Sequence, residues 1–416
     1  MKKPGAYQVY LFLEGASALL YSMIFAASSV YQVTVAGLSP LQLVLVGTTL
    51  ETAVFLFEIP TGVVADVYSR KLSIIIGLIL VGGGFILEGS IPIFWTILLA
   101  QILWGLGYTF TSGATQAWIS DEIGEQEANR AFLRANQVGN IAGLVGLAAG
   151  MTLGSFQINI PIQLGGGLLV GLGLFLIWSM PESGFQPIPR EDRSSWQNLV
   201  HTFRLGIQTV RSRPALLNIL SVGLIYGLYS EGFDRLWTKH LLDNFILPTA
   251  FNLQPVFWIG LMRVAGLLLA VGFTEIARRK INTGSFTAIA RALFFLSVLL
   301  IAGLFSFALA GSLAFAVLAY WLISITRDLI GPIYTAWVNQ RLEPGVRATV
   351  ISMSSQVDAI GQIAGGPVLG VIGSAVSVRA ALVASSAILS PILILYRRAI
   401  HSPAVHSNNE IKEQHL

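Results

Sequence analysis

Ionisable side chains inside long apolar segments are the groups of this sequence that could do chemistry. Glu14 and Glu51 lie in such segments, and neither has a basic residue within a helical turn. A charge at the centre of a bilayer costs at least about 2.5–3.5 kcal/mol on insertion scales, so these acids are candidates for function. Burial favours the neutral form of a carboxyl group, which can then carry a proton near neutral pH. We expect proton coupling or substrate contact at both positions. The alternative is a protonated acid that only hydrogen-bonds a neighbouring helix.

Further ionisable residues fall inside later apolar segments. We expect Arg263 and Asp358 to pair across two helices and Asp328 to line a cavity. Adjacent residues on a helix project about 100° apart, so Arg327 and Asp328 cannot both face one partner.

Other charged residues lie closer to segment ends. Glu231, Asp234 and Arg235 approach the end of one segment and form either an outer gate or a solvated helix end. Glu58 lies one helical turn before the charged stretch from Gly62 to Lys71, which we call the charged turn. We expect a structural role for Glu58.

The composition identifies the elements that must position these groups. Hydrophobic residues make up 54% of the 416 residues and charged residues only 11%, against roughly 25% in soluble domains. The chain is therefore predicted to be an all-α integral membrane protein, in contact with the lipid bilayer. It has no cysteine and only five scattered histidines, which exclude a disulfide framework and a Cys/His metal site. We expect neither a metal nor a cofactor.

The apolar segments form two sets of six, which predicts 12 transmembrane helices in two six-helix halves. The expected domains are an N-terminal half (1–180), a cytoplasmic connector (181–213), a C-terminal half (214–398) and a cytoplasmic tail (399–416). The spans are expected near 7–35, 41–65, 72–92, 93–118, 135–157 and 161–180, then near 214–236, 254–276, 286–308, 312–338, 350–373 and 376–398.

Basic residues recur in alternate loops, together with Lys2 and Lys3 at the N-terminus. The positive-inside rule then places both termini in the cytoplasm, with the loops 66–71, 119–134 and 278–285. We expect a multi-pass protein of the cell membrane, the plasma or inner membrane of a bacterium.

The two halves carry a sequence repeat. Ala117-Trp118 precedes Gln137-Val138 by the same distance that separates Ala336-Trp337 from Gln356-Val357. Six plus six spans with parallel halves are the plan of a secondary transporter whose site lies between the halves.

The stretch "GVVADVYSRK" gathers charge between the second and third segments. Its Gly62, Asp66, Arg70 and Lys71 have the spacing of a known signature, and the stretch resembles the major facilitator superfamily between its second and third helices. The neighbouring "FEIPTG" and "GYTFTSGATQAWISDE" resemble the drug-efflux branch, especially macrolide or multidrug exporters.

This resemblance implies a conformational latch. Asp66 would lie at the N-terminus of the eleventh span, and Arg70 would pair with an acid at the end of the fourth, here Asp121. The resemblance implies that these contacts exist only while the halves are closed on the cytoplasmic side. The alternative is an ordinary positive-inside loop, in which Asp66 merely offsets its neighbours.

The sequence also departs from the family pattern. Gln101 stands four residues before Gly105, where drug/proton antiporters usually carry a buried Arg, and Leu144 stands where their fifth span has Pro. Any proton coupling must therefore depend on acids alone.

These features predict a secondary active exporter of a hydrophobic or amphipathic small molecule, driven by proton antiport through a rocker-switch cycle. The alternative is an uptake carrier or uniporter for a small metabolite on the same fold. No Gly-x4-Gly-Lys phosphate-binding signature is present, so the chain is not expected to hydrolyse ATP or to be an enzyme. We expect a monomer that binds a small-molecule substrate and protons, and no nucleic acid.

Overall fold

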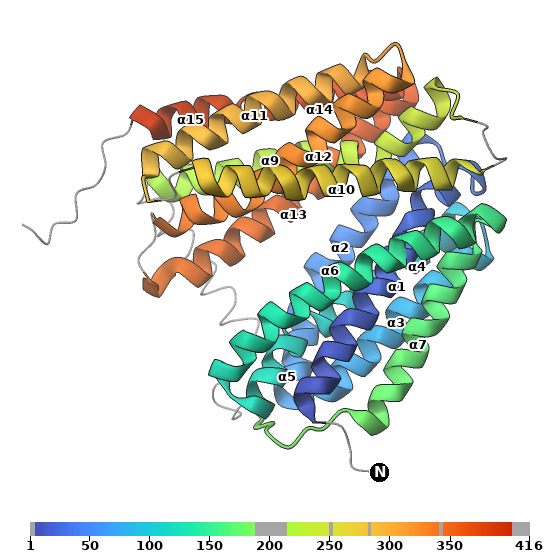
Figure 1. Cartoon of the computed structure of the whole chain (residues 1–416), viewed down its shortest axis with the longest axis vertical. Coiled ribbons are helices and arrows are strands. Elements are labelled where there is room, and N and C mark those ends of the chain that lie inside the picture. The colour runs from blue at the N-terminus through green and yellow to red at the C-terminus, as the bar shows by residue number, and fades with distance from the viewer. Residues whose placement is uncertain (1–4, 188–213, 249–252, 282–283, 341–343, 402–416) are drawn as a thin grey trace, which may run out of the picture.

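A computed structural model of the chain describes residues 5–187, 214–248, 253–281, 284–340 and 344–401 (Figure 1). Every regular element within these ranges is a helix. Twelve helical segments in this part of the chain are long and apolar enough to cross a membrane, which confirms the predicted fold class. Most of the predicted connector and tail lies outside the described residues.

The first six spans form one bundle, the N bundle. Its fourth span is divided into two helices at Gly113, whose φ of +71° favours glycine. The helices are α1 (Ala6–Thr34), α2 (Pro40–Val67), α3 (Arg70–Ser90), α4 (Phe94–Thr111), α5 (Ala114–Ile123), α6 (Glu125–Phe156) and α7 (Ile160–Ser179).

The last six spans form the second bundle, the C bundle. Its final span is divided near Pro391. The helices are α9 (Pro214–Asn244), α10 (Pro255–Lys280), α11 (Phe286–Ala308), α12 (Leu313–Gln340), α13 (Pro344–Ala375), α14 (Val378–Leu389) and α15 (Ile392–His401).

Helices pair in the same way in both bundles. The first span packs on the fifth (α1 with α6, α9 with α13), and the third packs on the fourth (α3 with α4, α11 with α12). The third helix of each bundle also begins at a serine N-cap: Ser69 Oγ accepts from the Leu72 amide at 2.9 Å, and Ser285 Oγ from the Ala288 amide at 3.4 Å. The sequence repeat therefore corresponds to a repeat in helix packing.

Several helices extend beyond their predicted spans, with the longest extensions at the start of α6 and at the end of α9. α6 begins at Glu125 rather than 135, and only Gly124, with a φ of +81°, separates it from α5, so 119–134 is not a loop. α9 continues to Asn244, so the expected end of the seventh span near 236 is wrong. Hydropathy locates the apolar part of a helix, whereas polar residues continue the helix into the interface.

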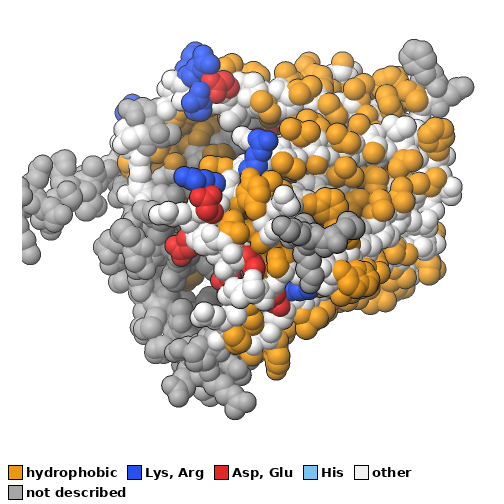
Figure 2. Space-filling model, turned by 60° about the horizontal axis from the view of Figure 1, so that its bottom comes forward, with side chains coloured by type: hydrophobic (Ala, Val, Ile, Leu, Met, Phe, Trp, Pro, Cys, Tyr) orange, Lys and Arg blue, Asp and Glu red, His pale blue; other side chains and the backbone are white. Residues whose placement is uncertain are grey.

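The helices place alternate turns at two ends of the molecule. We call the end with residues 68–69, 124 and 180–187 the connector face, and the end with residues 35–39, 91–93 and 157–159 the opposite face. In Figure 2 charged side chains gather toward the left of the view, whereas the wall to the right is mostly hydrophobic. An apolar wall of this kind suits contact with lipid.

Candidate functional site

The two bundles contact one another near the opposite face. The Leu41 amide of α2 donates a 2.9 Å hydrogen bond to Ser374 Oγ of α13. Gly260 of α10 lies against Met151 of α6. Toward the connector face the bundles diverge (Figure 1), and a Cβ on Gly62 would meet no atom within 4 Å. The molecule is therefore closed at the opposite face and parted at the connector face.

A cavity with two chambers lies between the bundles. The chamber nearer the opposite face has a volume of about 520 Å³, and the chamber nearer the connector face about 720 Å³. Residues of both bundles line each chamber. The residues that line both are Phe25, Arg263, Tyr320, Ser324 and Asp328.

Aromatic side chains line the first chamber from both bundles. The rings of Phe25 and Trp104 lie 5.2 Å apart, and those of Trp237 and Tyr320 lie 4.8 Å apart. Trp104 also packs on Phe85, so its ring both lines the cavity and belongs to the packed interior of the N bundle. This arrangement offers flat apolar surfaces to a bound solute.

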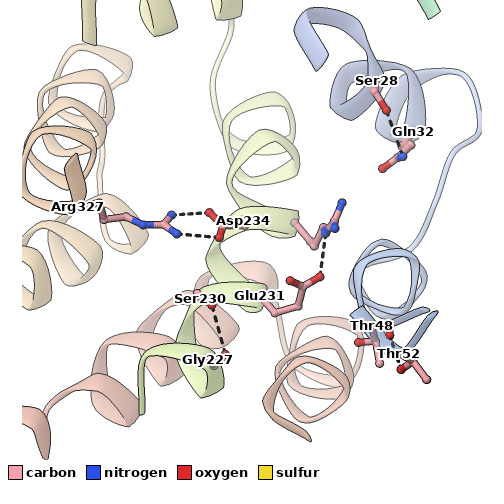
Figure 3. Close-up of polar contacts among 10 residues, drawn as sticks. Ser28, Gln32, Thr48, Thr52, Gly227, Ser230, Glu231, Asp234 and Arg327 are labelled. Atoms are coloured by element: carbon pink, nitrogen blue, oxygen red, sulfur yellow. Dashed lines mark hydrogen bonds and ion pairs between the residues drawn. The ribbon is translucent and has the colours of Figure 1, made fainter. Parts of the chain in front are cut away.

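Charged groups in the cavity come mainly from the C bundle. Arg263 crosses to the N bundle, where its guanidinium donates a 2.7 Å hydrogen bond to the Phe25 carbonyl. Asp328 lines both chambers, as predicted for a cavity acid, and no ion pair is found for it within the described residues. Arg327 also lines the first chamber, where it binds both carboxylate oxygens of Asp234 on α9 (Figure 3).

The expected pairing of Arg263 with Asp358 is wrong. Asp358 accepts a 2.8 Å hydrogen bond from Gln362 one turn further along α13, and Arg263 binds the Phe25 carbonyl. The sequence could not indicate that Arg263 points toward α1 rather than toward α13.

Glu231 and Arg235 form a buried ion pair where the bundles touch. Their carboxylate and guanidinium are 2.8 Å apart, and Glu231 is only 3% exposed. A Cβ on Gly47 of α2 would overlap this pair. Because α9 continues to Asn244, neither residue of the pair lies at a helix end, and Arg235 lines the first chamber together with Asp234.

The two acids predicted for coupling occupy different surroundings. Glu14 lines the second chamber with Tyr10. Glu51, on α2, is half-buried and lies within electrostatic range of Glu231, Arg235 and Asp358 from the C bundle. Glu51 therefore has a cationic neighbour that its sequence context does not reveal.

Glu88 is not among the residues that the sequence pattern singled out, although it is fully buried in the N bundle. Its carboxylate accepts hydrogen bonds from Ser28 Oγ (2.9 Å) and Gln32 Nε2 (2.8 Å) of α1 and from Gln101 Nε2 (3.1 Å) of α4. Gln101, at the position where the sequence resemblance predicts an Arg, thus binds an acid. The sequence does contain a signal for Glu88, because this acid lies inside the predicted span 72–92, four residues before its end.

Residues of the charged turn are bound within the N bundle. Arg70 and Asp121 are 3.1 Å apart, as the resemblance implied. Lys71 Nζ donates 2.8 Å hydrogen bonds to the carbonyls of Ile177 and Met180 at the end of α7. Because the Arg70–Asp121 pair exists with the bundles parted at this face, the expectation that it forms only in the closed state is wrong. The reason is that both residues belong to one bundle.

For Asp66 and Glu58 the described residues show no hydrogen bond or ion pair with the C bundle. Asp66 is half-buried, and the side chains at the start of α13, its expected neighbour, lie outside the described residues. Glu58 is exposed on α2, and no ion pair is found for it in the part of the chain that the structure describes.

Comparison with known proteins gives a family for this arrangement. The model of the Major Facilitator Superfamily matches residues 10–366. The uncharacterized MFS-type transporter YxaM of Bacillus subtilis (strain 168) is 27% identical over 368 residues, which cover 86% of each chain.

Solved structures agree on the fold. The crystal structure of the nucleoside transporter NupG has a TM-score of 0.73 at 14% identity and covers 96% of this chain and 100% of its own. A bacterial homolog of the human lysosomal transporter Spinster, in an inward-facing and occupied conformation, has a TM-score of 0.70 at 15% identity, with coverage of 95% and 97%. At these identities the likeness concerns the fold alone. Twelve spans and the long family match lead to one conclusion: the chain belongs to the major facilitator superfamily and is a multi-pass membrane transporter.

Proposed function

We propose that this transporter exports amphipathic organic molecules by proton antiport, through alternating access of the central cavity. The observation that carries the proposal is the cavity itself, which combines aromatic walls with Arg263 and with Asp328, an acid for which the described residues provide no ion pair. Its closure at one face and divergence at the other are what one state of a rocking transporter requires. The moving bodies are residues 1–180 and 214–398, and a single chain supplies the whole cavity, in keeping with a monomer.

The lining favours a particular solute class. Trp104 and Tyr320 suit the flat apolar part of an aromatic molecule, and Asp328 suits a positively charged group at its edge. Arg263 offers its remaining N–H groups to a carboxylate or carbonyl. The solute is therefore aromatic and carries at least one charged or strongly polar group.

The orientation follows from the distribution of basic residues. We propose that the connector face is cytoplasmic, because Arg70, Lys71, Arg278, Arg279 and Lys280 lie there. The described state is then open toward the cytoplasm, where an exporter takes up its substrate.

Uptake of a polar metabolite is the second candidate. It is favoured by the hydrophilic side chains Ser28, Ser29, Gln32 and Ser324 in the first chamber. Proteins of similar fold also include the nucleoside transporter NupG and a POT family transporter in complex with a conjugated peptide.

Transport in inverted membrane vesicles tests both candidates. The probes are ethidium, an aromatic cation, and uridine, a nucleoside, each measured with and without an imposed pH gradient. We expect gradient-dependent accumulation of ethidium, which is reduced in Asp328→Asn and retained in the exposed control Asp243→Asn. Accumulation that persists after the gradient is collapsed would refute proton antiport. Equilibration of uridine without ethidium movement would favour the carrier.

A further inference from the structure

Glu88 occupies a site that neither the cavity walls nor the charged turn explains. It is fully enclosed by α1, α3 and α4, and its three carboxylate partners, Ser28, Gln32 and Gln101, are all neutral donors. The Tyr31 hydroxyl donates a further 2.9 Å hydrogen bond to the Glu88 carbonyl. Burial of a carboxylate without a fixed cation is costly, so the site is suited to a group that changes its protonation state.

The site is connected to the cavity through α1. Ser28 and Gln32 line the first chamber, and both bind the same oxygen, Oε1, of Glu88. The Ser28 hydroxyl can accept a proton from cavity water and pass its own hydrogen to Glu88. A proton thus has a one-residue path from the chamber to the buried carboxylate.

Gln101 can serve both protonation states of Glu88. Its Nε2 donates to Glu88 Oε2, whereas its buried Oε1 has no hydrogen-bond partner within the described residues. A 180° rotation of the amide would present Oε1 to a protonated Glu88 as an acceptor. An Arg at this position could only donate, and its charge would hold Glu88 ionised.

The cation that acts on Glu88 belongs to the other bundle. Arg235 of α9 lies within electrostatic range of Glu88, while its own guanidinium is bound to Glu231. The helices α1 and α4 contribute no charged group at Glu88, and α7, which packs on α3, contains no ionisable residue. Any motion that separates the bundles at the opposite face would carry Arg235 away with α9.

We propose that Glu88 is a proton-binding site of the transport cycle, loaded through Ser28 when Arg235 withdraws and emptied when Arg235 returns. This inference rests on the proposed function. In loading, hydronium gives one proton to Ser28 Oγ, the Ser28 hydrogen passes to Glu88 Oε1, and water remains. The carboxylate becomes a neutral acid. Release toward the cavity reverses these steps.

Infrared difference spectroscopy of the purified chain tests the site without any substrate. Between alkaline and acidic pH, every Asp or Glu that takes up a proton contributes a carbonyl band, so the difference between the wild type and Glu88→Gln isolates the component of Glu88. Glu88→Gln should lose that component, because glutamine keeps the size and the hydrogen-bonding capacity of the site but cannot titrate. The exposed control Glu125→Gln should keep it. A band of unchanged intensity in Glu88→Gln, or no titrating band in folded wild type, would overturn the proposal.

The contribution of Arg235 is tested with the paired variant Glu231→Gln/Arg235→Gln. This change removes the cation without leaving Glu231 buried and unpaired. The Glu88 band should then develop at a higher pH than in the wild type, because loss of a nearby cation favours the protonated carboxyl group. An unchanged midpoint would overturn the role of Arg235.

Ethidium accumulation in inverted vesicles separates this inference from the proposed function. Glu88→Gln should abolish gradient-driven accumulation, and Glu125→Gln should not. Full accumulation by Glu88→Gln would refute the coupling role. If the wild type moves neither ethidium nor uridine although the Glu88 band titrates, the proposed function fails and the proton-binding site stands.

Discussion

The interface between the bundles has two unlike ends. Near the opposite face, Gly47 admits the buried Glu231–Arg235 pair of the other bundle. Near the connector face, Arg70 and Lys71 are bound to partners within their own bundle. Each of these ion pairs is formed within one bundle, but the Glu231–Arg235 pair of α9 also packs against Gly47 of α2, whereas Arg70 and Lys71 bind groups of the N bundle.

This difference explains what the charged turn can do. Arg70 is already paired with Asp121 of its own bundle while the bundles are parted at this face. Closure of the bundles therefore does not have to form this pair. Only Asp66 is left to contact the C bundle, so the energy available for a latch is that of one carboxylate at a helix terminus, about 0.3–2 kcal/mol. Such a modest energy allows the closed state to open again.

The largest expected contrast between the two ends is their accessibility from outside the cell. Tyr68, at the connector face, is 71% exposed, and Val376, at the opposite face, is 74% exposed. In intact cells an impermeant thiol reagent should label Val376→Cys and leave Tyr68→Cys unlabelled, and lysis should make both reactive. The cysteine-free parent chain is the control. The reverse pattern would invert the proposed topology.

Filling Gly47 should give the next largest effect. Gly47→Val would overlap Glu231 and Arg235, which opposes closure at the opposite face by about 3 kcal/mol, so transport should fall by about 100-fold. Disulfide formation between Leu41→Cys and Ser374→Cys should fall with it. The matched control is Gly171→Val, since no atom lies within 4 Å of a Cβ there. Equal disulfide yields in the two variants would contradict the proposed contact.

Removing one partner of the buried pair should destabilise the fold. Arg235→Leu leaves Glu231 buried without its cation and should lower the free energy of unfolding by about 3 kcal/mol. The double variant Glu231→Leu/Arg235→Leu should recover most of that loss. Thermal unfolding in detergent gives both values. A double variant no more stable than the single one would show that the pair is not coupled.

At the connector face, Asp66→Asn should reduce transport by about tenfold at normal membrane levels, the effect of a coupling free energy of about 1.4 kcal/mol. Arg70→Ala should act differently, because its pair with Asp121 exists in the described state. We expect it to lower thermal stability as well as transport. If transport is unchanged in both variants, the segment is an ordinary positively charged loop.

The smallest effect is expected at an exposed pair on the same face. Glu127 and Arg130 of α6 are 2.7 Å apart, but their side chains are 59% and 79% exposed. Glu127→Gln should therefore change the free energy of unfolding by less than about 0.5 kcal/mol and leave transport unaltered. A larger change in thermal unfolding would place this segment in a contact between the bundles.

Local patterns predicted much of this molecule. The order of the twelve spans follows from runs of apolar residues, and the Arg70–Asp121 contact follows from two motifs at the ends of neighbouring helices. The position of Asp328 in the cavity was also expected from its burial in an apolar span. Each of these inferences needs only the periodicity of one helix or the turn between two.

The rest depends on packing between distant segments. Arg263 binds a carbonyl of α1, a partner without any side-chain signature in the sequence. The carboxylate of Glu88 is bound by three neutral side chains, two from α1 and one from α4. The spacing of these residues in the sequence does not indicate that they meet, because their contact depends on how the helices pack. Likewise, α6 and α9 extend beyond their apolar segments, because polar residues continue each helix past the apolar core of the membrane.

The neutral shell around Glu88 bears on how the proposed transporter would respond to membrane voltage. The charge of Glu88 changes by one unit when the carboxylate takes up a proton. Exchange of one proton for a monovalent cation would then move no net charge, and voltage would do no work on the cycle. Exchange for a neutral solute would move one charge, worth about 2.3 kcal/mol per 100 mV. The charge of the solute would thus decide whether the electrical part of the proton gradient drives this protein.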